Sequence, residues 1–199
     1  MAYTARFKII PAIVIMLSLS APLFAADVND GFEVGRQTKS RYFNIFIQPG
    51  TDIDQLTLYL SVPPGIRAMI SASVSDFDTF NLPNQLDLLY LAVSETLDVR
   101  LKKFECNIKI CKDSPSLTAI TERLYGTAVE KAGGFYVPEA DTIYLDAQSV
   151  SINVLAHELS HAIQSKYFVI PPPTKVQEVL AGFVEFQFRK QTGTLPKGK

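Results

Sequence analysis

The two histidines of the chain, His157 and His161, lie four positions apart in the segment His-Glu-Leu-Ser-His. On an α-helix this spacing places both imidazoles on one face, one turn apart, where they can bind the same metal ion. Glu158 stands between them and adds a carboxylate that can accept a proton from a metal-bound water. We therefore expect a helix over residues 150–164 that carries two metal ligands and a general base.

The surrounding sequence separates this motif from a chance match. Glu158 is the only formally charged residue between Ala147 and Ser165, which predicts a buried helix. A carboxylate in such a helix must be paired, close to a metal, or protonated. The alternative, an incidental core helix without a metal, would leave Glu158 buried without a partner, which is unfavourable.

A third ligand must come from elsewhere in the chain, because catalytic zinc usually takes three protein ligands and a water. There is no third histidine and no thiol pair near the motif, so an acidic residue is required. Residues 175–191 predict a final helix with Glu178 and Glu185 on nearly one face. Ala181 and Gly182 would let this helix approach the motif helix closely. We favour Glu178 as the ligand, with Glu185 either supporting the site or replacing Glu178 as the ligand.

Residues 134–191 resemble the zinc metallopeptidases called gluzincins, through the HELSH motif and Glu178 in Gln-Glu-Val-Leu-Ala-Gly. Two features depart from that family: Gly182 stands where many members carry an acidic residue, and no histidine follows the motif. The resemblance implies a zincin-like fold and one Zn²⁺ per chain, held by His157, His161 and Glu178. It also implies peptide-bond hydrolysis with Glu158 as general base. A peptide or protein substrate would pair with the strand at 135–137 or 142–145.

A second function stays open, namely an exported zinc-stabilised binding module of the cell envelope with weak or no catalysis. No residue is assigned to hold the developing oxyanion of a peptidase. Tyr136, Tyr144 and Tyr167 are possible donors, although each fits a packing role as well. The intact Glu158 favours the enzyme, because a purely structural site has no use for that carboxylate.

The N-terminus predicts export. Arg6 and Lys8 precede an apolar run at residues 9–19, and small residues follow, so residues 1–25 have the layout of a signal peptide. The run is shorter than the roughly 20 residues of a membrane span, although an uncleaved anchor is the alternative. We expect a periplasmic or secreted protein with no stable membrane insertion after signal removal.

The charge balance argues against a nucleic-acid partner. Removal of residues 1–25 leaves 17 basic and 20 acidic residues, a formal net charge of −3, without a basic block. Cys106 and Cys111 are the only cysteines, and an even count at short spacing in an exported chain predicts a disulfide between them. Half of a zinc site is the alternative, but the chain offers no further Cys or His to complete it.

The pattern of elements predicts an α+β fold of the zincin-like kind. After a loose mature N-terminus at 26–40, residues 41–199 form a single domain, and the sequence does not indicate its oligomeric state. A small twisted sheet contains the hairpin strands and the strand at 42–48. The motif helix, the glutamate-bearing helix and a long helix at 84–104 pack against it. Shorter helices are expected at 54–61 and 116–124.

Overall fold

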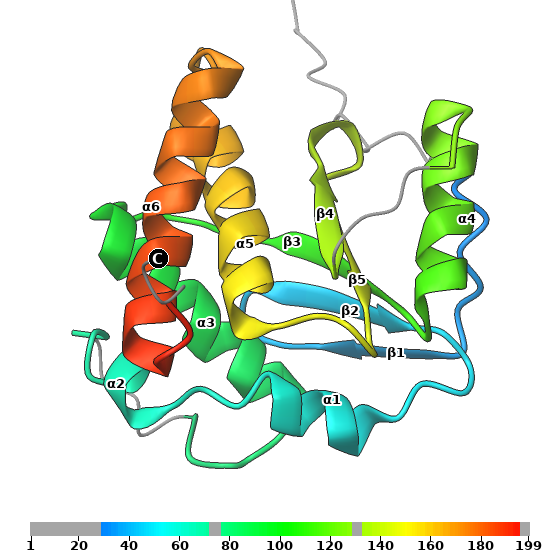
Figure 1. Cartoon of the computed structure of the whole chain (residues 1–199), viewed down its shortest axis with the longest axis horizontal. Coiled ribbons are helices and arrows are strands. Elements are labelled where there is room, and N and C mark those ends of the chain that lie inside the picture. The colour runs from blue at the N-terminus through cyan, green and yellow to red at the C-terminus, as the bar shows by residue number, and fades with distance from the viewer. Residues whose placement is uncertain (1–28, 72–76, 129–132, 196–199) are drawn as a thin grey trace, which may run out of the picture.

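The structure, a computed structural model, describes residues 29–71, 77–128 and 133–195, so the predicted signal peptide at 1–25 lies outside the described residues. Within them the chain has an α+β fold with a five-stranded mixed sheet and α-helices around it (Figure 1). The strands are β1 (Arg36–Lys39), β2 (Phe43–Ile47), β3 (Cys106–Cys111), β4 (Gly134–Val137) and β5 (Thr142–Asp146). The helices are α1 (Ile53–Tyr59), α2 (Pro64–Arg67), α3 (Leu82–Leu97), α4 (Ser114–Tyr125), α5 (Ile152–Tyr167) and α6 (Thr174–Thr192).

The sheet has the strand order β1-β2-β3-β5-β4, so β1 and β4 are its two edges. The central pairs β2·β3 and β3·β5 are parallel, whereas β1·β2 and β4·β5 are antiparallel. The predicted hairpin is confirmed. A short 3₁₀ helix, Pro138–Ala140, and Asp141 in the left-handed conformation (φ 46°) connect its two strands.

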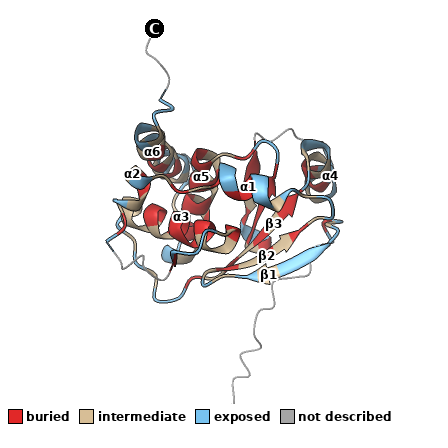
Figure 2. Cartoon of the chain, turned by 90° about the horizontal axis from the view of Figure 1, so that it is seen from below, coloured by how far each residue is buried: buried red, intermediate tan, exposed pale blue. Residues whose placement is uncertain are grey.

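The hydrophobic core lies mainly between one face of the sheet and the helices α3 and α5 (Figures 1 and 2). Alternate residues of each strand supply it, such as Ile45 in β2, Ile108 in β3 and Ile143 in β5, which are all fully buried. A smaller cluster on the opposite face packs α4 against the hairpin through Leu117 and Tyr144, among others. The motif helix is therefore held against the main core, as expected.

Two helix boundaries differ from those expected. The sequence predicts a helix that continues to residue 104, but α3 ends at Leu97 because Asp98 adopts the left-handed conformation (φ 53°) and terminates it. Phe104 continues the apolar spacing only by coincidence, since it folds back and stacks on Tyr90 with ring centroids 4.2 Å apart. The helix expected from Ser116 begins at Ser114, because Asp113 is its N-cap and accepts a hydrogen bond from the Ser116 N–H.

The expectation of a loose N-terminus at 26–40 is wrong for its described part. The polar strand β1 pairs through its backbone with β2, and it has no hydrophobic pattern because its side chains are mostly exposed. Upstream, the buried Asp30 carboxylate bonds to the Lys109 ammonium and accepts a hydrogen bond from the Tyr144 hydroxyl at 2.5 Å. Backbone pairing and a buried ion pair therefore hold this segment against the sheet.

The expected disulfide between Cys106 and Cys111 is also wrong, because both thiols are free and occupy the two ends of β3. Five residues of extended chain separate their Cα atoms by about 16 Å, well beyond the roughly 7 Å limit of a disulfide. The two side chains also belong to the packing clusters on opposite faces of the sheet. Burial raises the pKa of Cys111 to about 12 and that of Cys106 well above its ordinary value, so both thiols are protonated and unreactive at neutral pH.

In the part of the chain that the structure describes, no helix combines the length and apolar character needed to cross a membrane.

Candidate metal centre

Helix α5 carries the motif and presents it to a pocket. Ser151 caps the helix by accepting a hydrogen bond from the Val154 N–H, and one side of the helix is buried through residues such as Leu155 and Leu159. His157 and His161 lie on the other side and are partly exposed, with side-chain accessibilities of 23% and 16%. The sequence predicts a helix that is buried on all sides. One side of the helix is instead partly exposed, because it lines the pocket.

Helix α6 brings the third candidate ligand to the histidines. It packs against α5 through Ala181, Val184 and Phe188, which are fully buried. Glu178 Oε2 lies 3.5 Å from His157 Nε2, and Glu178 Oε1 lies 3.6 Å from His161 Nε2. Ala181 therefore permits the close approach that we expected, but Gly182 does not contribute to it, since a Cβ at that position would meet no neighbouring atom.

The candidate ligand atoms are spaced close to the distances that a tetrahedral ion requires. The Nε2 atoms of His157 and His161 are 3.2 Å apart, and each lies 3.5–3.6 Å from a different oxygen of Glu178. One ligand atom from each of the three residues therefore falls within 4.8 Å of the others. Ligands that bind zinc at about 2.0–2.1 Å in tetrahedral geometry lie roughly 3.3–3.5 Å from one another. Two ring nitrogens with facing lone pairs repel unless a proton or a cation lies between them. Among the described residues, His157, His161 and Glu178 are a group that could hold a metal ion.

The electrostatics favour the metal-binding form of His161. Burial of the imidazole lowers the pKa of His161, and the neighbouring His157 lowers it further, while Glu178 acts in the opposite direction. A lowered pKa keeps the ring neutral at pH 7, and a neutral imidazole is the form that binds a metal.

Glu185 contacts the other side of His157. Its Oε2 lies 3.3 Å from His157 Nδ1, which is the ring nitrogen that faces away from His161 and Glu178. The contact is within ion-pair distance, and Nδ1 has no hydrogen-bond partner among the described residues. Glu185 Oε1 accepts a hydrogen bond from Arg189 Nε at 2.8 Å, and Arg189 Nη2 lies 2.8 Å from the same oxygen. Glu185 thus approaches the far side of the His157 ring, and Glu178 remains the candidate ligand.

Glu158 is turned toward the edge strand of the sheet. Its Oε2 accepts a hydrogen bond of 2.9 Å from the backbone N–H of Tyr136 in β4. The carboxylate lines the same pocket as the two histidines and Glu178. Glu158 is thus partnered, as its place in an otherwise apolar segment predicts, and it lies beside the candidate ligands.

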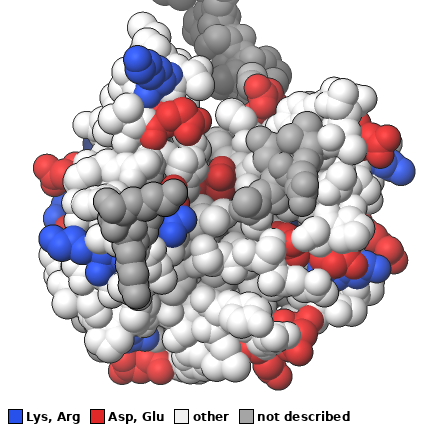
Figure 3. Space-filling model, viewed as in Figure 1, with Lys and Arg blue, Asp and Glu red and all other residues white. Residues whose placement is uncertain are grey.

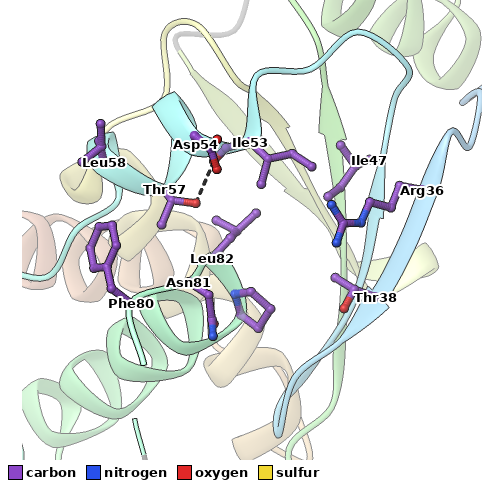
Figure 4. A pocket seen from close by; sticks show the side chains of 11 residues that line it. Arg36, Thr38, Ile47, Ile53, Asp54, Thr57, Leu58, Phe80, Asn81 and Leu82 are labelled. Carbon is purple, nitrogen blue, oxygen red and sulfur yellow. Dashed lines mark hydrogen bonds between the residues drawn. The ribbon is translucent and has the colours of Figure 1, made fainter. Parts of the chain in front are cut away.

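The pocket has a volume of about 360 Å³ and lies between α5, α6 and β4. Figure 3 shows a hollow in the middle of this face of the molecule, with acidic side chains in it and beside it. A second pocket of about 450 Å³ lies at the opposite edge of the sheet, between β1, α1 and the start of α3 (Figure 4). Its lining combines apolar residues with Arg36, Asp54, Thr38, Thr57 and Asn81 and includes no histidine, so it does not offer a comparable set of metal ligands.

None of the three tyrosines considered as oxyanion donors is free to act as one. The Tyr144 hydroxyl bonds to Asp30 on the far face of the sheet, and the Tyr136 hydroxyl lies 3.2 Å from Asp141 Oδ1 and 2.8 Å from Ser165 Oγ. Tyr167 lines a different cavity, next to Phe168 and Leu180.

The polar residues around the motif tie α5 to α6. Gln164 donates hydrogen bonds to Ser160 Oγ at 3.0 Å and to the carbonyl of Gln177 at 3.3 Å. Asn153 donates to Thr194 Oγ1 at 3.1 Å. These contacts fix the distance between the helix with the histidines and the helix with Glu178.

The sequence analysis expects the strand at 135–137 or 142–145 beside the site, but it missed the hydrogen bond from β4 to Glu158. Tyr136 contributes a backbone N–H, which carries no signal in the side-chain pattern. Gly134 also lines the pocket, and a Cβ there would lie 2.6 Å from the carbonyl oxygen of Tyr144, so only glycine fits without a shift. The Gly133-Gly134 pair before the hairpin is the one sequence signal that could have indicated a close approach of backbones.

The geometry thus brings together His157, His161, Glu178 and Glu158, the four residues that the sequence singles out. The chain matches no protein-family model, no curated protein and no solved structure. The functional interpretation therefore depends on the residues and distances of the site itself.

Proposed function

We propose that the chain is a zinc-dependent metallopeptidase that hydrolyses peptide bonds with Glu158 as general base. The observation that carries this proposal is the convergence of one ligand atom each from His157, His161 and Glu178 within 4.8 Å of one another, from two helices, beside the carboxylate of Glu158. A structural zinc site is usually closed by four protein ligands, whereas a catalytic site has three and leaves one position for water. The set of three ligands in an open pocket therefore supports the catalytic alternative.

The residues of the site divide the chemistry between them. A zinc ion held by His157, His161 and Glu178 would act as a Lewis acid and lower the pKa of its bound water from about 15.7 toward 7. Glu158 takes the proton of the attacking water and gives it to the leaving amine. Glu185 keeps His157 in the orientation in which Nε2 faces the ion, because its negative charge attracts the Nδ1–H.

The edge strand β4 is the element that an extended peptide would pair with. β5 has strands on both sides and cannot accept another, whereas β4 is paired on one side only among the described strands, and its residues line the pocket. The N–H of Tyr136 points away from β5, since it donates to Glu158. Addition of a substrate strand along β4 would place a peptide bond across the metal centre, in the β-addition mode of recognition.

One observation favours the second candidate, a zinc-stabilised binding module without efficient catalysis. The hydroxyls of Tyr136 and Tyr144 are engaged elsewhere, and Tyr167 lines another cavity. A peptidase that lacks such a donor depends on the metal alone to stabilise the oxyanion. Zinc binding without hydrolysis would distinguish this candidate from the enzyme.

The proposal is tested by metal analysis together with hydrolysis of a quenched fluorescent peptide library. We expect about one zinc per chain, which is lost in His157→Ala and His161→Ala. Glu158→Gln should retain zinc and the melting temperature but reduce hydrolysis by roughly 10²- to 10⁴-fold, because it removes the proton acceptor. Glu139→Gln is the matched control, since Glu139 is an exposed carboxylate on the hairpin turn that does not line the pocket.

Two results would overturn the proposal. Zinc retained at full stoichiometry in both histidine variants would show that the metal binds elsewhere. Hydrolysis by Glu158→Gln at the rate of Glu139→Gln would exclude the general base.

A further inference from the structure

Helix α6 has a second apolar face that the described fold does not cover. Its buried face packs on α5, but Val176, Val179, Phe183 and Phe186 are all exposed. Their spacing of three, four and three residues places them in one stripe along the helix. Helix α6 is therefore apolar on two sides, and only one of them is used by the fold.

The turn before α6 adds two more exposed aliphatic side chains. Val169 is 100% exposed and Ile170 is 83% exposed, and Pro171-Pro172-Pro173 follow directly. Figure 1 shows this turn at the far end of the α5–α6 pair, beyond the sheet. Because proline fixes φ, the segment presents its two aliphatic side chains on a stiff support. We name Val169, Ile170 and the four stripe residues of α6 the docking face.

The docking face is large for a protein that stays alone in solution. Its six side chains expose an area on the order of 600 Å², the upper end of what monomeric proteins leave open. Continuous apolar patches of this size mark contacts with another protein or with a membrane.

Two lysines of α6 border the docking face. Lys175 and Lys190 lie near the two ends of the stripe, both exposed, and neither forms an ion pair with a described residue. The acidic residues of α6, Glu178 and Glu185, are turned toward His157. This positive fringe contrasts with the formal net charge of −1 for the whole chain.

We infer that the docking face binds the surface of an anionic phospholipid bilayer, with Val169 and Ile170 inserted at the level of the headgroups. Apolar side chains bordered by lysines are the pattern of helices that lie in a membrane interface, where lysines meet anionic lipids. A second copy of the chain fits less well. An antiparallel pair of α6 helices would place Lys175 opposite Lys190, and a parallel pair would place each lysine opposite itself. The contact is peripheral, in agreement with the finding that no described helix could span a membrane.

The test follows the environment of single side chains in the chain without residues 1–25, because the apolar run of the predicted signal peptide would itself bind vesicles. An environment-sensitive nitrobenzoxadiazole label is attached to Ile170→Cys, or to Leu58→Cys as the matched control on α1, where Leu58 is also exposed. The two native cysteines are buried and do not compete for the label. Vesicles contain either phosphatidylglycerol mixed with phosphatidylethanolamine or phosphatidylcholine alone.

We expect the emission of the label at position 170 to shift to the blue with phosphatidylglycerol vesicles and to change little with phosphatidylcholine. The label at position 58 should not respond to either. Adding Lys175→Glu to Ile170→Cys should raise the lipid concentration at half-maximal response about fivefold or more, because each lysine near an anionic surface contributes to binding. This readout does not depend on hydrolysis or on bound zinc.

The inference is wrong if the label at position 170 remains water-exposed at all lipid concentrations. It is equally wrong if the label shifts without vesicles as the protein concentration rises, since that result identifies a second copy of the chain as the occupant. A blue shift that is equal at positions 170 and 58 would indicate non-specific adsorption and would also contradict it.

Discussion

Replacement of Glu178 should weaken zinc binding far more than replacement of Glu185, although the two residues lie on one helix and both contact His157. The difference follows from the nitrogen that each carboxylate approaches. Glu178 Oε2 is 3.5 Å from Nε2, which faces His161, whereas Glu185 Oε2 is 3.3 Å from Nδ1 on the opposite side of the ring. Only Glu178 can share an ion with both histidines.

The expected size of the effect can be worked from the number of ligands. Structural zinc sites with four ligands bind with about 10–16 kcal/mol, or roughly 2.5–4 kcal/mol for each ligand. Glu178→Ala should therefore raise the zinc dissociation constant by roughly 60- to 700-fold, at about 1.4 kcal/mol for each factor of ten. Residues that orient a ligand typically contribute 10- to 100-fold, which is the range expected for Glu185→Ala.

Competition with a chromophoric chelator measures both constants directly, and thermal unfolding gives an independent check. Zinc at about 1,000 times its dissociation constant stabilises a protein by about 4 kcal/mol, and a chain of this size gains about 2–4 °C in melting temperature per kcal/mol. The wild type should gain roughly 8–16 °C, while Glu178→Ala should gain only about 1–7 °C at the same zinc concentration. Glu139→Ala controls for the loss of an exposed carboxylate. Equal effects of the two substitutions, or a larger effect of Glu185→Ala, would refute the ligand assignment.

Three further predictions concern the fold. Thiol titration in denaturant without reductant should find two free thiols per chain, and none would mean that Cys106 and Cys111 are bridged after all. Burial alone would raise the pKa of Asp30, but its hydrogen bonds from Lys109, Tyr144 and the Phe32 N–H outweigh burial and lower it, so its ionised form stabilises the fold. Asp30→Asn should thus destabilise by about 2–3 kcal/mol at pH 7 in urea unfolding. That difference should be fully present above about pH 4 and disappear as the pH falls through the lowered pKa; a pH-independent difference would contradict the ion pair. Gly134→Ala should destabilise by about 1–3 kcal/mol because of its clash with the Tyr144 carbonyl, whereas Gly182→Ala should stabilise by up to about 1 kcal/mol, and the opposite signs would count against the described backbone.

The sequence predicts most of the site because its residues follow a strict local geometry. The two histidines are four apart on a strongly patterned segment, and helix periodicity alone places their rings side by side. Glu178 follows from chemistry, since the missing ligand had to be acidic and few acids occur nearby. The hairpin and the strand at 42–48 follow from their β-branched and aromatic residues.

The rest depends on contacts that a one-dimensional pattern does not contain. β3 was missed because its two cysteines suggested a disulfide. Ile108 and Ile110 nevertheless alternate with polar residues, as a strand requires. β1 is polar and is held by backbone pairing, which any sequence can provide. Asp98 ends α3 through its backbone conformation, while the apolar spacing continues past it. The role of the Tyr136 N–H depends on tertiary structure alone.

The hydrogen bond from the Tyr136 N–H to Glu158 links the binding of a chain at the edge strand β4 to the release of the Glu158 carboxylate. One N–H aligned with one acceptor cannot serve a second acceptor equally well. An extended chain that pairs with β4 at Tyr136 must therefore take this donor away from Glu158. Under the proposed function, binding of such a chain would release the Glu158 carboxylate where a peptide bond lies beside it, whereas in the empty pocket the Tyr136 N–H holds that carboxylate.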